Sequence, residues 1–173
     1  MANHNDILIA NLNETIKSAQ TYLLTGNGAA LFLFVLAVQG KLAKGTPEQD
    51  WSIPFVGLSA PTFTAALIAL AIYILSGLLV HSFLTHSKRI QARLSAECSG
   101  TAVLDTVLTY PSLLTISLTM QMGATLLPAL LGACALLLAY YDGHGFWKAA
   151  WTGTVCALPY LILTWRLFTA RGK

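Results

Sequence analysis

The stretch TFTAALIALAIYILSGLLVHSFL, residues 62–84, decides the fold of this chain. It contains no Asp, Glu, Lys or Arg, and at 1.5 Å per helical residue it would form a helix about 35 Å long. A hydrocarbon core about 30 Å thick needs about 20 apolar residues in a helix. Core helices of soluble domains are usually shorter and keep a polar face. The stretch therefore predicts a membrane-spanning helix.

Three further apolar stretches flank this one, each separated from the next by a short polar loop. They cover residues 22–39, 113–140 and 146–168. The chain of 173 residues is 55% hydrophobic and only 10% charged, whereas soluble domains carry about 25% charged residues. We therefore predict an all-α membrane protein, a four-transmembrane-helix bundle with an N-terminal amphipathic helix. Residues 1–173 form a single membrane domain, with the amphipathic helix in 1–20 and spans at about 20–40, 62–84, 112–140 and 146–168.

Both of the first two spans have helical sequence beyond their apolar part. Ahead of the first span, apolar residues recur every three or four positions, which predicts an amphipathic helix; they are Leu8, Leu12, Ile16, Ala19 and Leu23. This helix either lies on the inner leaflet, packs on the basic stretch after the second span, or continues into the first span. After residue 84 the sequence HSKRIQARLSAE has no Gly or Pro. The second span is therefore expected to continue about three turns beyond the membrane.

Proline and glycine mark the expected breaks. Pro128 lies inside the third apolar stretch and cannot donate a hydrogen bond to the carbonyl of Ala124, so a kink is predicted there. The loop from Lys41 to Pro61 contains several helix-breaking residues and is expected to be irregular.

Basic residues predict the orientation in the membrane. Seven of them fall on one side of the predicted spans, namely Lys17, Lys88, Arg89, Arg93, Arg166, Arg171 and Lys173. Three fall on the other, namely Lys41, Lys44 and Lys148. Because lysine and arginine favour the cytoplasmic side, both termini are expected in the cytoplasm. We interpret Lys88, Arg89, Arg93, Arg166 and Arg171 as contacts for lipid head groups or a partner, and not for nucleic acid.

Polar residues inside a bilayer are costly, so a function in the membrane should appear there. No acidic or basic residue lies at the middle of a predicted span, which argues against proton-coupled transport and hydrolytic chemistry within the bilayer. Asn27 lies between two glycines and is either a contact between helices or a contact to a pore or ligand. Thr115, Thr119 and Gln121 lie in the third span, where they either pack and bond to their own helix or line a polar seam in an oligomer.

The histidines and cysteines do not form a recognisable site. His81 and His86 are five residues apart, about 500° around a helix, so they do not share a face. The three cysteines, Cys98, Cys134 and Cys156, have no paired spacing. We expect no catalytic residues, no metal, no disulfide and no cofactor.

The stretch TIKSAQTYLLTGNGAALFLFVLA, residues 15–37, resembles the opening of small uncharacterised bacterial four-span inner-membrane proteins. In that group an amphipathic helix leads into a span that begins Asn-Gly-Gly-Ala. This chain has Asn27-Gly28-Ala29-Ala30, which departs at the second glycine. The resemblance covers the first two spans and implies a multi-pass protein of the bacterial inner membrane with cytoplasmic ends. It implies no activity.

Three functions remain open at this point. The first is a non-enzymatic membrane protein that acts by self-association, as a homo-oligomer, or by docking a membrane-protein partner. The second is a small oligomeric channel or holin-like pore, lined by the hydroxyls of the third span. The third is a membrane anchor subunit of a larger complex.

Overall fold

The computed structural model describes residues 4–39, 50–52, 59–97 and 118–169. Within these ranges the chain forms four helices: α1 (His4–Val38), α2 (Thr62–Glu97), α4 (Leu118–His144) and α5 (Phe146–Thr169). Two short strands, β1 (Asp50–Ser52) and β2 (Ser59–Pro61), precede α2. The described part of the chain is therefore helical apart from this one hairpin.

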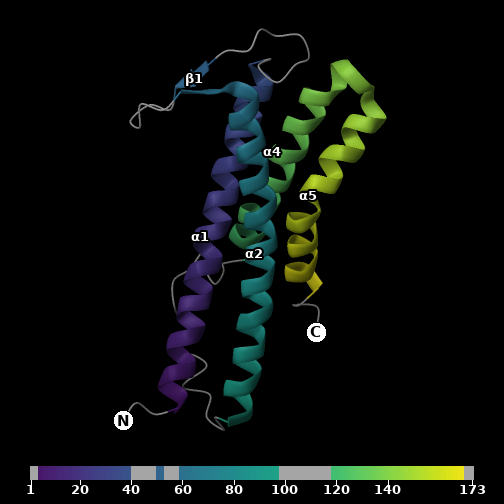
Figure 1. The fold of residues 1–173 in the computed structure, drawn as a ribbon. Coiled ribbons are helices and arrows are strands. Elements are labelled where there is room, and N and C mark those ends of the chain that lie inside the picture. Colours follow the sequence, from purple (N-terminus) through teal and green to yellow (C-terminus); the bar gives the residue numbers. More distant parts are fainter. Residues whose placement is uncertain (1–3, 40–49, 53–58, 98–117, 170–173) are drawn as a thin grey trace.

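The helices alternate in direction and pack as a bundle (Figure 1). α1 packs along both α2 and α4, and α4 packs along α5. α5 touches α2 more lightly. The start of α1 and the end of α5 lie toward the same end of the bundle (Figure 1).

The first two helices are much longer than the other two. α1 has 35 residues and α2 has 36, and both continue past the lower ends of α4 and α5 (Figure 1). We call this projecting part, residues 4–18 and 86–97, the stem. It confirms that the second apolar stretch continues for about three turns as helix. It also confirms that the amphipathic segment and the first apolar stretch form one continuous helix.

The stem has a small hydrophobic core of its own. Leu12 and Ile16 of α1 are buried together with Ile90 and Leu94 of α2. The amphipathic segment therefore both continues into the first apolar stretch and packs on the basic stretch that follows residue 84, so two of the sequence-based alternatives hold together. Because the apolar positions recur at helical spacing on both helices, the two stem segments bury one face each against the other.

Two connections differ from the sequence-based expectation. The loop from Lys41 to Pro61 was expected to be irregular, but β1 and β2 pair within it as antiparallel strands, with Trp51 opposite Ala60. α4 runs to His144, four residues beyond the expected end of the third span. The chain then reverses at Gly145, whose φ of 78° is accessible to glycine at little cost. The amide of Gly145 donates to the carbonyl of Tyr141 at 3.3 Å, so the turn follows the helix directly.

Two helices in the described residues are long and apolar enough to cross a membrane. They are Asp6–Val38 and Thr62–Leu94, with mean hydropathies of 1.7 and 2.4 in their most apolar windows. The apolar part of α4, Gly123–Ala139, is shorter. A core helix of a soluble protein can be as apolar, but it is mostly buried. Here only 28% and 33% of the two windows is buried inside the bundle, so most of this apolar surface points outward.

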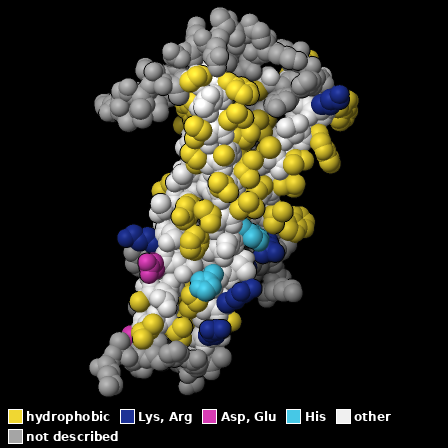
Figure 2. Space-filling view, in the orientation of Figure 1, with side chains coloured by type: hydrophobic (Ala, Val, Ile, Leu, Met, Phe, Trp, Pro, Cys, Tyr) yellow, Lys and Arg dark blue, Asp and Glu magenta, His cyan; other side chains and the backbone are white. Residues whose placement is uncertain are grey.

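The outward-facing surface separates apolar from charged side chains. Figure 2 shows hydrophobic side chains over the bundle, with basic, acidic and histidine side chains gathered toward the stem and a single basic side chain near the opposite end. Large apolar side chains on the outside include Phe63 at 65% exposed and Leu75 at 57%. A water-soluble monomer rarely exposes a contiguous apolar surface of this extent. The described part of the structure therefore fits association with a membrane.

Candidate functional site: the polar centre of the bundle

Asn27 joins α1 to α4 at the position where Pro128 leaves a carbonyl without its helical partner. In a regular helix the amide of residue 128 would donate to the carbonyl of Ala124, but proline has no N–H. The side-chain nitrogen of Asn27 donates to that carbonyl at 3.1 Å and to the carbonyl of Leu23 at 2.9 Å. An amide on one helix thus replaces the missing donor of another. The side-chain oxygen of Asn27 is buried and has no hydrogen-bond partner among the described residues.

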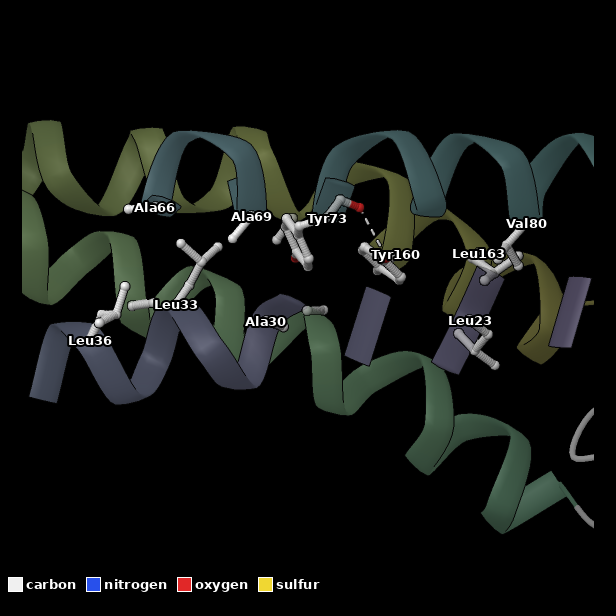
Figure 3. Close-up of a cluster of buried hydrophobic side chains, with 13 residues drawn as sticks. Leu23, Ala30, Leu33, Leu36, Ala66, Ala69, Tyr73, Val80, Tyr160 and Leu163 are labelled. Atoms are coloured by element: carbon white, nitrogen blue, oxygen red, sulfur yellow. Dashed lines mark hydrogen bonds between the residues drawn. The ribbon is translucent and has the colours of Figure 1, made fainter. Parts of the chain in front are cut away.

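Two buried tyrosines form the centre of the bundle. Tyr73 of α2 and Tyr160 of α5 stack with their ring centroids 4.9 Å apart and an angle of 23° between the rings. The hydroxyl of Tyr73 donates to the carbonyl of Pro128 at 3.1 Å. The hydroxyl of Tyr160 donates to the carbonyl of Tyr73 at 3.0 Å (Figure 3). These bonds link α2, α4 and α5, and both rings are fully buried.

Glycines make the room that the two rings need. A Cβ on Gly132 of α4 would lie 2.6 Å from the Cζ atom and the hydroxyl oxygen of Tyr73. A Cβ on Gly77 of α2 would lie 2.9 Å from the ring of Tyr160, and one on Gly26 of α1 would overlap the Tyr160 hydroxyl. Each tyrosine therefore fills a space that a glycine on a neighbouring helix leaves open.

A further hydroxyl pair joins α4 to α5. The side-chain oxygens of Thr125 and Thr164 are hydrogen-bonded at 3.0 Å. Between the same two helices, a Cβ on Gly153 would lie 2.8 Å from the carbonyl oxygen of Ala133. The backbones of α4 and α5 thus approach closely, as small residues allow in packed helices.

The structure places some of the predicted site residues and not others. Asn27 lies between α1 and α4, as described above. The side chains of Thr119 and Gln121 lie outside the described part of the structure, although both residues belong to α4, and Thr115 and Arg171 lie outside the described residues altogether. The predicted polar seam of the third span therefore stays a prediction. Pro128 lies inside the continuous helix α4.

The basic residues predicted as head-group or partner contacts lie where the sequence placed them along the helices. Lys88, Arg89 and Arg93 are exposed on the stem part of α2, and Arg166 is exposed near the end of α5. His81 of α2 lies close enough to Arg166 for the two to interact electrostatically. The basic surface is thus formed by two helices rather than by α2 alone.

Sequence reasoning missed Tyr73 and Tyr160. A signal for them existed, because tyrosine prefers the membrane interface and both residues lie near the middle of an apolar stretch. A tyrosine at that depth needs a hydrogen-bond partner inside the protein. The identity of those partners, two backbone carbonyls on other helices, could not be read from the sequence.

The hydrogen bonds of this arrangement hold helices together. Its polar groups are hydroxyls, one amide and backbone carbonyls. No group of three or more His, Cys, Asp or Glu that could hold a metal ion occurs among the residues that the structure describes. No protein-family model, no curated protein and no solved structure matches this chain.

Proposed function

We propose that this chain is a multi-pass protein of the bacterial inner membrane in which α1, α2, α4 and α5 all cross the bilayer. In this arrangement the stem and both termini face the cytoplasm, because the basic residues near the stem outnumber those at the opposite end. The four helices in the described residues alternate in direction, with the start of α1 and the end of α5 toward the same end of the bundle, which supports termini on the same side.

The spacing of charges on α5 supports a fourth span. Lys148 and Arg166 are exposed near its two ends and are separated by 18 residues, about 27 Å of helix. This is close to the hydrocarbon thickness of about 30 Å. Between them the outer face carries apolar side chains such as Trp151 and Ile162, which are 73% and 45% exposed. Lipid would cover these side chains in the proposed orientation.

Within the membrane, we propose that the bundle acts as a non-enzymatic scaffold and that the stem docks a partner or a second copy of the chain. The observation that carries this proposal is that polar side chains bond between helices in the bundle but are exposed on the stem. In the bundle, Asn27, Tyr73 and Tyr160 bond to neighbouring helices. On the stem, by contrast, charged side chains point outward, and these are the groups that give an interface its specificity.

A channel has less support. Thr125 is the described hydroxyl nearest to the predicted polar seam, and it bonds to Thr164 rather than lining an open path. The remaining candidates, Thr115, Thr119 and Gln121, have no described side chains. The pore hypothesis therefore rests on the sequence pattern alone.

Site-specific photo-crosslinking in native membranes tests the docking proposal. A benzophenone amino acid is placed at Arg93 on the stem, at Lys148 at the opposite end, and at Leu67, which is 50% exposed on the apolar face of α2. We expect a discrete protein adduct from position 93 and none from positions 148 and 67. A mass increase of one chain, 18.5 kDa, indicates self-association, whereas any other discrete mass indicates a different partner. The absence of an adduct at position 93 would contradict docking by the stem.

An ion-flux measurement from liposomes that contain the pure protein separates docking from channel activity. We expect no flux. Conductance that is lost on Gln121→Leu would replace the docking proposal with a pore lined by the third span.

A further inference from the structure

One flank of the stem carries a row of basic side chains on α2, His86, Arg89 and Arg93, which we call the basic stripe. Their spacing of three and then four residues keeps them within about 60° of one another around the helix. All three are exposed. Lys88 is exposed as well, but it lies at least about 100° around the helix from each of them, so it does not belong to the stripe.

The helices that pack on α2 contact other faces of it. α1 packs on the face that carries Ile90 and Leu94. α5 approaches α2 at Gly77, where a Cβ would lie 2.9 Å from the ring of Tyr160. The basic stripe lies at least about 120° around α2 from Gly77. Within the described residues the stripe is therefore an open surface of the stem.

The charge of the basic stripe is complementary to an acidic partner. Arg89 and Arg93 lie one helical turn apart, and like charges at this spacing repel each other. Among the residues that the structure describes, no hydrogen bond or ion pair engages either guanidinium group. A carboxylate from outside relieves this repulsion, because it can accept two parallel hydrogen bonds from a guanidinium.

The direction of the basic stripe favours a protein helix over lipid head groups. From His86 to Arg93 the stripe follows the axis of α2 for about 10.5 Å, and α2 runs along the length of the bundle (Figure 1). Arg93 lies about 13.5 Å of helix beyond Leu84, where the apolar stretch ends. The polar layer outside the hydrocarbon is only about 5–8 Å thick. In the proposed orientation Arg93 therefore extends past the head groups.

The described residues of a second copy do not offer a matching row of carboxylates. The acidic residues whose side chains the structure describes are Asp6 and Glu14, both on α1. They are about 12 Å apart along the helix and about 80° apart around it. Asp6 also already interacts within the chain. A different protein fits the basic stripe better.

We propose that the basic stripe binds an acidic helix of a different protein, which lies along the stem with carboxylates one turn apart opposite Arg89 and Arg93. This inference rests on the proposed docking by the stem and names the chemistry of the partner. A helix aligned with α2 can repeat its carboxylates at the same spacing as the two guanidinium groups. His86, one turn nearer the membrane, supplies a further hydrogen-bond donor to the same helix.

Zero-length crosslinking in native membranes tests this inference. Arg89→Lys and Arg93→Lys are made one at a time, and each keeps the charge while adding a primary amine to the stripe. A carbodiimide then joins this amine to a carboxylate only where the two groups are in contact. We expect both variants to give an adduct with the same protein, on carboxylates three or four residues apart in its sequence. The unchanged chain should not give this adduct, because its amine at Lys88 lies off the stripe.

A second set of variants measures what the two charges contribute. A benzophenone amino acid at position 86 reports contact with the partner in the same membranes. Arg89→Gln together with Arg93→Gln should lower the yield of this photo-adduct about fivefold, because two exposed ion pairs are lost. Lys17→Gln together with Lys88→Gln removes the same charge from exposed positions off the stripe and should leave the yield unchanged. Equal yields from the two double variants would overturn the assignment to the stripe.

The adducts separate this inference from the docking proposal. A carbodiimide adduct with one further chain, 18.5 kDa, or with a single phospholipid replaces the acidic partner by a second copy or by the head-group layer. Crosslinks scattered over many proteins, or none at positions 89 and 93, also overturn the inference. If photo-crosslinking at position 93 still gives a discrete adduct, docking by the stem stands and only the acidic partner is wrong. If that adduct is missing too, the docking proposal fails as well.

Discussion

The bond from Asn27 to Ala124 yields a prediction that couples two distant positions. Asn27→Leu removes the only described side-chain donor to the carbonyl that Pro128 leaves unpaired. If the side chain of Asn27 stabilises the bundle by donating to this carbonyl, the loss of unfolding free energy caused by Asn27→Leu must depend on whether residue 128 is proline. In the Pro128→Ala background, the restored N–H of residue 128 can donate to the carbonyl of Ala124, and the side chain of residue 27 is no longer needed.

The expected magnitude follows from the groups involved. Side-chain hydrogen bonds between membrane helices contribute about 0.6 kcal/mol on average and up to about 1.7 kcal/mol. A buried carbonyl left without a donor costs about 1–3 kcal/mol. Leucine also removes the buried, unpartnered oxygen of Asn27, which offsets part of the loss. We therefore expect Asn27→Leu to lower the free energy of unfolding by about 1 kcal/mol with Pro128 present, and by less than about 0.5 kcal/mol in the Pro128→Ala background.

A double-mutant cycle measures this coupling. The four proteins are unfolded reversibly in mixed micelles by increasing the fraction of sodium dodecyl sulfate, and helix content is followed by circular dichroism. Comparison within the cycle cancels the effect that Pro128→Ala has by itself. Equal costs of Asn27→Leu in the two backgrounds would refute the reasoning, because the amide would then stabilise the bundle independently of the proline.

Two further predictions concern the tyrosine centre and the stem. Gly132→Ala should lower the free energy of unfolding by about 1–3 kcal/mol, because the new methyl group overlaps the buried ring of Tyr73. Gly28→Ala, where a Cβ meets nothing within 4 Å, should not be destabilising; equal losses for the two variants in the micelle assay would argue against the packing described. Leu94→Ala should raise hydrogen exchange in residues 4–18 and 86–94 while leaving residues 66–80 protected, since it opens the core of the stem only. Unchanged exchange in the stem would mean that this core does not hold the two helices together.

The helices themselves were largely predictable, because the signals for them are local. Apolar stretches of sufficient length predicted α2 and α5 closely, and the absence of glycine and proline after residue 84 predicted the extension of α2 to Glu97. The spacing of apolar residues in the stem segment of α1 also indicated the face that packs. Which surface this face would meet remained open, because both the inner leaflet and the basic stretch after the second span could cover it. In the structure this face packs against Ile90 and Leu94 of α2.

The polar centre was not predictable, because it depends on relations between distant residues. Pro128 predicts an unpaired carbonyl at Ala124. Nothing in the sequence, however, indicates that Asn27, nearly a hundred residues earlier, supplies the donor. The same holds for Tyr73, whose ring fits against Gly132 only because α2 and α4 adopt one particular register. The β1–β2 hairpin was missed for a related reason. Its strands have three residues each, too few to show an alternating pattern.

The bonds of the polar centre bear on what the bundle contributes to the proposed docking. Packing between apolar helices in a bilayer is tolerant of small rotations and shifts, because lipid tails and side chains are equally apolar. A hydrogen bond from Tyr73 to the carbonyl of Pro128, or from Asn27 to that of Ala124, is satisfied in one register only. These bonds fix α1 and α2 against α4. Because the stem is the direct continuation of α1 and α2, a fixed register in the membrane also fixes the direction and rotation of the stem outside it. The polar groups in the bundle can therefore matter for recognition without contacting the partner.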